Sequence, residues 1–236
     1  MRRYRAANGK AQLWFAQGEI ERIIECELTS SGLMPTVAEP VVDLERFVER
    51  HLSVALDHYA ELDSDVLGTT EFFRGKGARI SINRDLTGSA LDNRKPSVGT
   101  RGRWRATLAH EAGHVILHRK LFDVGLPPGA GGRRSLRMER HRQQCLKSNV
   151  PHSDDVDPRE YQANQAMAVL LMPRGVFLEI AREEISRAFP GCDRVPPGSE
   201  LRLAVRIARR LEVSRQAAAI RMSTLGLSSS PGLRRA

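Results

Sequence analysis

The sequence contains few cysteines and no long apolar segment. Its three cysteines, Cys26, Cys145 and Cys192, are an odd number at irregular spacing, which fits neither a disulfide framework nor a cysteine-based zinc site. The longest unbroken apolar run is the seven residues 166–172, whereas a helix that spans a bilayer needs about 20. Polar residues interrupt the segment that follows the basic start, so no signal peptide is predicted. We therefore expect reduced thiols and a cytoplasmic protein that does not enter a membrane.

Positive charge is what the sequence has in excess. Lys and Arg number 37 against 28 Asp and Glu, a net charge of +9, and one explanation is an acidic partner such as a nucleic acid. Residues 201–236 contain eight Arg and one Glu, and residues 133–147 contain five Arg, one Lys and one Glu. The hydrophobic fraction of 41% and the charged fraction of 28% are ordinary for a globular chain, which excludes a fully disordered or fibrous one.

The hydrophobic periodicity predicts an α+β chain that is mostly helical. Helices are predicted over 11–34, 43–60, 103–121, 159–171, 175–188, 200–211 and 214–225, and a small antiparallel sheet over 66–73 and 78–83. Residues 84–102 are predicted to be a loop, and one short helix is expected near 136–146. The predicted division is an N-terminal helical extension (1–39), a main domain (40–188) with an insertion loop (122–158), a C-terminal helix pair (189–227) and a disordered tail (228–236).

One short motif, His110-Glu111-Ala112-Gly113-His114, lies within an apolar segment and carries recognisable chemistry. On a helix, positions four apart differ by about 40° of rotation and about 6 Å of rise, so both imidazoles can face one metal ion. Zinc suits two neutral imidazoles, and Glu111 can accept a proton from water and later deliver it to a leaving amine. Burying these polar side chains without a metal ion to bind them would cost folding free energy. The motif therefore predicts a zinc-dependent peptidase with His110 and His114 as ligands and Glu111 as the catalytic base.

A catalytic zinc ion needs a third protein ligand and an open position for water. Glu160 is the best candidate, because it lies at the start of an apolar helix that can pack beside the motif helix. His118 shares the face of His114, but ligands on three successive turns would spread over about 12 Å. Cys145 and His152 could reach the metal only if the insertion folds back toward it.

Two linked segments, 105–118 with the His-Glu-x-x-His motif and 160–173 beginning Glu-Tyr-Gln-Ala-Asn, resemble the ImmA/IrrE family of zinc metallopeptidases. Residues 80–83 and 211–222 are also similar to that family, so the resemblance covers about residues 40–227. It implies a zincin-like domain in which His110, His114 and Glu160 bind a zinc ion and Glu111 is the base. It further implies that the protein cleaves a regulatory protein, typically a helix-turn-helix transcriptional repressor.

Two further expectations concern partners. The strand at 78–83 could accept an extended substrate by pairing at its edge beside the zinc. Residues 1–39 are too short for a helix-turn-helix repressor domain of the kind to which some family members are fused, so a stand-alone form is expected, and any such repressor would be a separate protein.

The alternative function is a regulator that binds DNA through the C-terminal helix pair, or a scaffold with a silent zinc site. Six arginines give that pair positive potential for phosphates: Arg202, Arg206, Arg209, Arg210, Arg215 and Arg221. Packing of the apolar faces of both helices onto the catalytic core explains the same pattern, and we favour it. Steeply salt-dependent binding to duplex DNA would support the regulator, and no binding even at low salt would exclude it.

Overall fold

The computed structural model describes residues 2–5, 11–73, 77–94, 97–122, 140–146, 157–192 and 195–227. Within these ranges the longer helices are α1 (Gln17–Ser30), α4 (Val98–Phe122), α5 (Pro158–Leu171), α6 (Arg174–Ala188), α7 (Glu200–Leu211) and α8 (Arg215–Thr224). Four short helical segments are α2 (Leu44–Arg46), η1 (Phe47–His51), α3 (Arg84–Thr87) and η2 (Gly88–Asp92). None of the described helices is long and apolar enough to cross a membrane.

A four-stranded mixed sheet completes the α+β fold. Its order is β3 (Ala55–Ala60), β5 (Gly77–Asn83), β4 (Val66–Phe73) and β6 (Arg140–Leu146). Strand β3 runs parallel to β5, whereas β4 is antiparallel to both β5 and β6. A separate antiparallel pair is formed by β1 (Arg2–Arg5) and β2 (Ala11–Trp14). The predicted fold class, mostly helical with a small mixed sheet, is confirmed.

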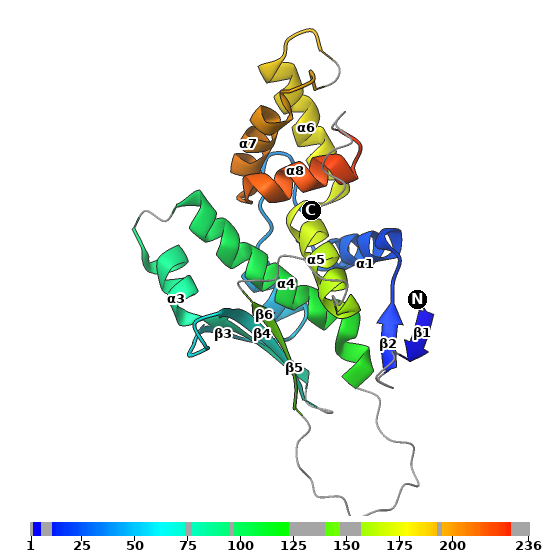
Figure 1. The fold of residues 1–236 in the computed structure, drawn as a ribbon, viewed down its shortest axis with the longest axis vertical. Helices are drawn as coiled ribbons and strands as arrows, with labels where there is room; N and C mark the ends of the chain where they lie inside the picture. The colour runs from blue at the N-terminus through cyan, green and yellow to red at the C-terminus, as the bar shows by residue number, and fades with distance from the viewer. Residues whose placement is uncertain are drawn as a thin grey trace, which may run out of the picture.

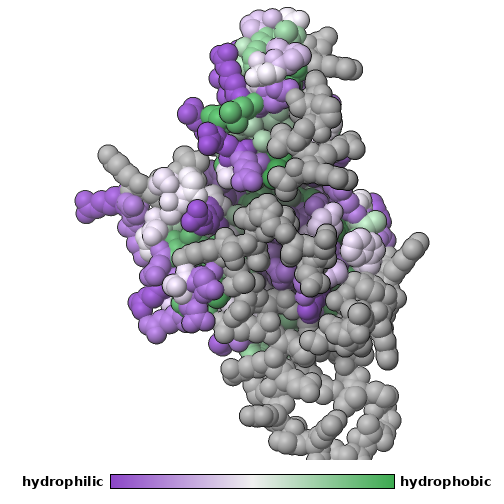
Figure 2. Space-filling view, viewed as in Figure 1, coloured by the Kyte–Doolittle hydropathy of each residue, from purple (hydrophilic) through white to green (hydrophobic). Residues whose placement is uncertain are grey.

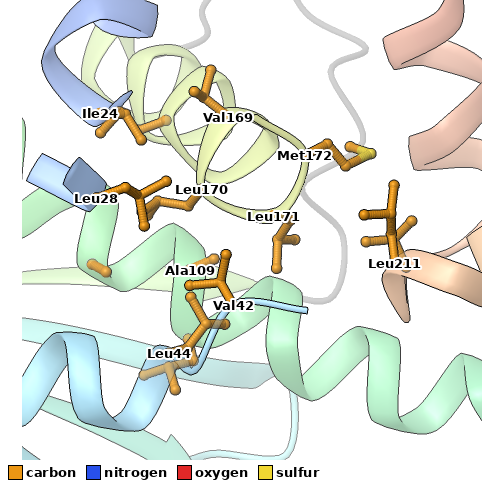
Figure 3. Packing of buried hydrophobic residues seen from close by; sticks show 14 of the residues in the cluster. Ile24, Leu28, Val42, Leu44, Ala109, Val169, Leu170, Leu171, Met172 and Leu211 are labelled. Atoms are coloured by element: carbon orange, nitrogen blue, oxygen red, sulfur yellow. The ribbon is translucent and has the colours of Figure 1, made fainter. Parts of the chain in front are cut away.

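Helix α4 occupies the middle of the molecule, with the sheet on one side and α5 on the other (Figure 1). Helix α1 packs on α5, and α6, α7 and α8 form the far end of the ribbon (Figure 1). Figure 3 shows Ile24 and Leu28 of α1 beside Val169 and Leu170 of α5, with Ala109 of α4 nearby. All five side chains are buried, and burying a large aliphatic side chain contributes about 1.5–3 kcal/mol.

Small residues let α4 and α5 approach closely. A Cβ atom built at Gly113 would lie 2.9 Å from the Cβ of Ala166 and 3.1 Å from the carbonyl oxygen of Ala163. Contacts that short do not leave room for a methyl group, so this crossing depends on glycine at position 113. The crossing matters for the site, because it sets the first turn of α5 against the histidines of α4.

The backbone of β4 makes a similar approach to the other side of α4. A Cβ atom at Gly68 would lie 2.7 Å from Cγ2 of Thr107 and 3.2 Å from Cγ of Glu111. Strand β4 can therefore lie directly against the motif helix only because position 68 has no side chain.

The C-terminal helices α7 and α8 are attached to the rest of the molecule partly by their arginines. Arg206 donates to Glu184 at 2.6 Å, and Arg210 donates to Glu183 at 2.7 Å. Arg221 is buried, pairs with a carboxylate of α1 and donates to the carbonyl oxygen of the residue that follows α5. Figure 2 shows hydrophilic side chains beside a few hydrophobic ones at this end of the molecule. These contacts favour the packing interpretation of the basic helix pair.

The N-terminal half differs from the predicted helices. Residues 11–14 form β2, and the helix expected over 11–34 runs only from Gln17 to Ser30. The helix expected over 43–60 is wrong after His51: residues 55–60 form β3, and Ser53 has a positive φ of 52° between them. The local apolar spacing of residues 55–60 suited a helix. These residues form a strand because they pair with β5, which lies more than 20 residues later in the chain.

Three further expectations need correction. Residues 84–92, expected in a loop, form α3 and η2, and α4 already begins at Val98. The short helix expected near 136–146 is the strand β6 over its described residues, because the open edge of β4 pairs with it. Strand β5 is paired on both sides, so it cannot accept a substrate strand at an edge. The predicted tail, most of the insertion, and His152 lie outside the described residues.

The close crossing of α4 and α5 leads to a stability prediction. Replacing Gly113 by Ala should lower the free energy of unfolding by about 1–3 kcal/mol, because the added methyl group overpacks the crossing. Urea denaturation measures this change.

The matched control is Gly18→Ala, also on a helix, where a Cβ atom meets nothing within 4 Å. This change should cost no stability. If both variants unfold at the urea concentration of the wild type, the crossing is looser than described.

Candidate metal centre

Three side chains from α4 and α5 converge on one point. Nε2 of His110 lies 3.1 Å from Nε2 of His114 and 3.1 Å from Oε2 of Glu160, and Nε2 of His114 lies 3.2 Å from Oε1 of Glu160. Both histidines are buried, and Glu160 is partly buried in the first turn of α5. The side chain of Asp157 begins that helix by accepting a hydrogen bond from the backbone of Arg159. The structure thus brings all three sequence-predicted ligands together.

The spacing of these donor atoms suits a metal ion. Tetrahedral zinc with bonds of 2.0–2.1 Å places its ligand atoms about 3.3 Å apart, close to the separations between the three side chains. Two imidazole nitrogens and one carboxylate oxygen form a typical donor set for a catalytic site with an open position. The residues present therefore fit a metal ion.

The other ring nitrogen of each histidine is held by a second side chain. Nδ1 of His110 lies 3.0 Å from Oδ1 of Asn164, an acceptor, so this nitrogen carries the proton and Nε2 is free to bind a metal. Nδ1 of His114 lies 3.1 Å from Nδ1 of His118. Partners of this kind fix the tautomer and ring orientation of histidine ligands.

His118 lies outside the donor cluster but is buried beside it. Burial, together with the charge of His114, lowers the pKa of His118 to about 3, so its ring is neutral. Its Nε2 has no hydrogen-bond partner among the described residues. His118 therefore contacts His114 without joining the three converging donor atoms, in agreement with the distance argument from the sequence.

Glu111 is completely buried between α4 and β4. Oγ1 of Thr70 donates a hydrogen bond of 2.6 Å to its Oε2, whereas Oε1 has no partner among the described residues. Burial raises the pKa of Glu111, although His110 and His114 oppose the shift. One carboxylate oxygen is thus fixed, and the other is available for proton transfer.

Charge within the cluster moves two other groups in opposite directions. Burial lowers the pKa of His110, but the hydrogen bond with Glu160 and the negative charge of Glu111 outweigh it, so the net shift is upward. Burial would raise the pKa of Glu160, but hydrogen bonds with both histidines lower it far below its usual value. Glu160 is therefore an ionised carboxylate, the form that binds a cation.

The structure also brings Cys145 of β6 to the same place. Its Sγ, one ring nitrogen of His110 and one carboxylate oxygen of Glu111 all lie within 4.8 Å of one another. Burial raises the pKa of this thiol, and the charges of Glu111 and Glu160 add to the shift. The sequence predicts that Cys145 can approach the metal ligands only if the insertion folds back. Strand β6 is the part of the insertion that folds back, because it pairs with β4.

Sequence reasoning missed the contacts around the predicted ligands. The sequence predicts Thr70 and Gly68 only as strand residues, although alternation places them on one face. Asn164 follows Glu160 by four residues, a spacing that puts both on one side of α5. No local signal indicated that β4 would be the strand beside Glu111, because that contact joins residues 41 apart.

Comparison with known protein families indicates to which class of protein this chain is similar. A protein-family model described as the IrrE N-terminal-like domain of the M78 peptidases matches residues 137–223. Together with the His/Glu donor cluster, this match indicates a metallopeptidase, and hence a protein substrate.

The match also confirms the resemblance of this chain to the ImmA/IrrE family. The matched segment contains Glu160, Asn164, helices α5 to α7 and α8 except for its last residue, whereas the motif on α4 precedes it. A search of curated proteins found no match.

The bond between Thr70 and Glu111 yields a second prediction. Replacing Thr70 by Val should lower the free energy of unfolding by about 1–3 kcal/mol, because a buried carboxylate then loses its only side-chain hydrogen-bond donor among the described residues. Thr70→Ser keeps the hydroxyl group and should recover part of the loss. Urea denaturation of both variants checks this, and equal stability of the Val and Ser variants would contradict it.

Proposed function

We propose that this protein is a zinc-dependent endopeptidase in which His110, His114 and Glu160 hold the zinc ion and Glu111 is the general base. The observation that carries the proposal is the position of a buried carboxylate next to three converging donor atoms of the His₂Glu type. Catalytic zinc sites with this donor set keep a fourth position open. When bound there, zinc would activate a water molecule and polarise the peptide carbonyl group.

Glu111 would accept and then donate the proton that is transferred during the reaction. Its Oε2 accepts a hydrogen bond from Thr70, so the carboxylate cannot rotate freely. Oε1 would take the proton of the attacking water and later transfer it to the nitrogen of the leaving amine. A base works best when its pKa lies near the working pH, and the burial of Glu111 shifts its pKa in that direction.

Asn164 and His118 would be positioning residues. Each contacts the Nδ1 of one histidine, which leaves the two Nε2 atoms directed at the same point. Binding through Nε2 of His114 requires its Nδ1 to carry the proton, and Nδ1 of His118 would then be the acceptor. Loss of such an outer contact typically lowers metal affinity by about 10–100-fold.

The substrate we propose is a regulatory protein, such as a helix-turn-helix transcriptional repressor. Support comes from the resemblance to the ImmA/IrrE family and from the family-model match. On this proposal the protein relieves repression by cutting the repressor, in the cytoplasm. The basic helix pair would pack against the core and have no direct part in the cleavage, since Arg206, Arg210 and Arg221 are already paired with carboxylates.

Metal content tests the ligand assignment. The wild-type protein should contain one zinc ion per chain by elemental analysis. His110→Ala and Glu160→Ala should lose it, because each removes a ligand, whereas Glu111→Gln should keep it. The control is His51→Ala, since His51 pairs with Glu27 away from the cluster. Absence of zinc from the wild type after reconstitution would overturn the proposal.

Proteolysis tests the role of Glu111. Lysate proteins incubated with the zinc-loaded enzyme should acquire new amino termini, detectable by mass spectrometry, and a transcriptional repressor should be among them. Glu111→Gln should slow this cleavage by about 10²–10⁴-fold, because the base is lost while the metal stays. If the Gln variant cleaves as fast as the wild type, Glu111 is not the base. If no cleaved protein is a DNA-binding regulator, the substrate assignment is wrong.

A further inference from the structure

Strand β6 is the element next to β4 in the sheet, and it carries a metal-binding side chain toward the centre. Cys145 of β6 lies opposite Gly68 of β4 in the antiparallel ladder. Side chains that face each other across a ladder lie on the same side of the sheet. A Cβ atom at Gly68 would point at Glu111, so the thiol of Cys145 also lies on the side of the sheet that faces α4.

Because Gly68 has no side chain, β4 lies directly against α4, and the neighbouring strand β6 also contacts that helix. Sγ of Cys145 reaches to within 4.8 Å of a ring nitrogen of His110 and of a carboxylate oxygen of Glu111. His110 also belongs to the cluster with His114 and Glu160. The two clusters therefore share one histidine, His110.

A second observation at the same spot points to a bound cation. Oε1 of Glu111 is fully buried and lacks a hydrogen-bond partner among the described residues. A buried carboxylate oxygen without a partner is costly. A metal ion held close to His110 would compensate the negative charge of that oxygen, and the thiol of Cys145 is a possible donor on the sheet side.

We propose that Cys145 is a fourth protein ligand of the metal held by His110, His114 and Glu160. This inference rests on the proposed function, since it uses the same ion. Thiolate sulfur binds zinc at about 2.3 Å and is among its commonest ligands. As the sulfur–metal bond forms, the S–H bond breaks and the proton passes to solvent.

A site with four protein ligands is chemically different from one with three. Closed sites of this kind are structural, whereas hydrolysis needs the fourth position for water. Cleavage by the zinc-loaded protein would therefore require the thiol to leave the metal first. Departure of the thiol would open the position for water, so the chain would carry its own inhibitory ligand.

Cobalt substitution tests the proposal without relying on activity. The full-length protein is loaded with Co²⁺, and its absorption spectrum is recorded. Four-coordinate Co²⁺ gives visible bands whatever its ligands, whereas a sulfur ligand adds a charge-transfer band in the near ultraviolet. We expect both sets of bands in the wild type, and loss of the near-ultraviolet band alone in Cys145→Ser.

The matched control is the double variant Cys26→Ser and Cys192→Ser. Both of these cysteines are exposed, so the near-ultraviolet band should survive. If the wild type shows visible bands but no near-ultraviolet band, or if Cys145→Ser keeps that band, Cys145 is not a ligand and the three-ligand site stands. If His110→Ala shows the same visible bands as the wild type, or if no Co²⁺ binds at all, the proposed metal site itself fails, and the thiol ligand with it.

Discussion

The close crossing of α4 and α5 is the contact on which the centre depends. Gly113 allows it, since its missing side chain lets the backbone at Ala163 and the methyl group of Ala166 lie directly against α4. Glu160 precedes Ala163 by less than one helical turn, so the crossing determines where its carboxylate lies relative to the two histidines. A wider separation of the helices would leave the donor atoms too far apart for one ion.

The opposite side of α4 is organised by the sheet. Strand β4 brings Gly68 and Thr70 against Glu111, so one strand supplies both the space for that side chain and the hydrogen bond that orients it. Strand β6 then pairs with β4 and adds Cys145. Helix α4 thus meets the carboxylate of Glu160 on one face and the strands that surround Glu111 on the other.

Much of the fold and site could be predicted because the determining signals are local. The spacing of His110 and His114 on a helix follows from 3.6 residues per turn. The apolar run of α5 indicated a buried helix next to the motif, and so made Glu160 the best candidate for a third ligand. The predictions failed where pairing between distant segments decided the outcome: residues 55–60 and 140–146 became strands because β5 and β4 offered open edges. Such pairing leaves little trace in local periodicity.

The sequence by itself determined the chemistry: which side chains could bind a metal, which carboxylate could be the base, and that the two segments carrying them would be helices. Only the tertiary structure decided the surroundings of those groups. Thr70, Asn164 and Cys145 meet the motif through contacts between elements that are far apart in the chain. The physical reason is that helix spacing is a property of neighbouring residues, whereas the partner of a buried polar group depends on how complete elements pack.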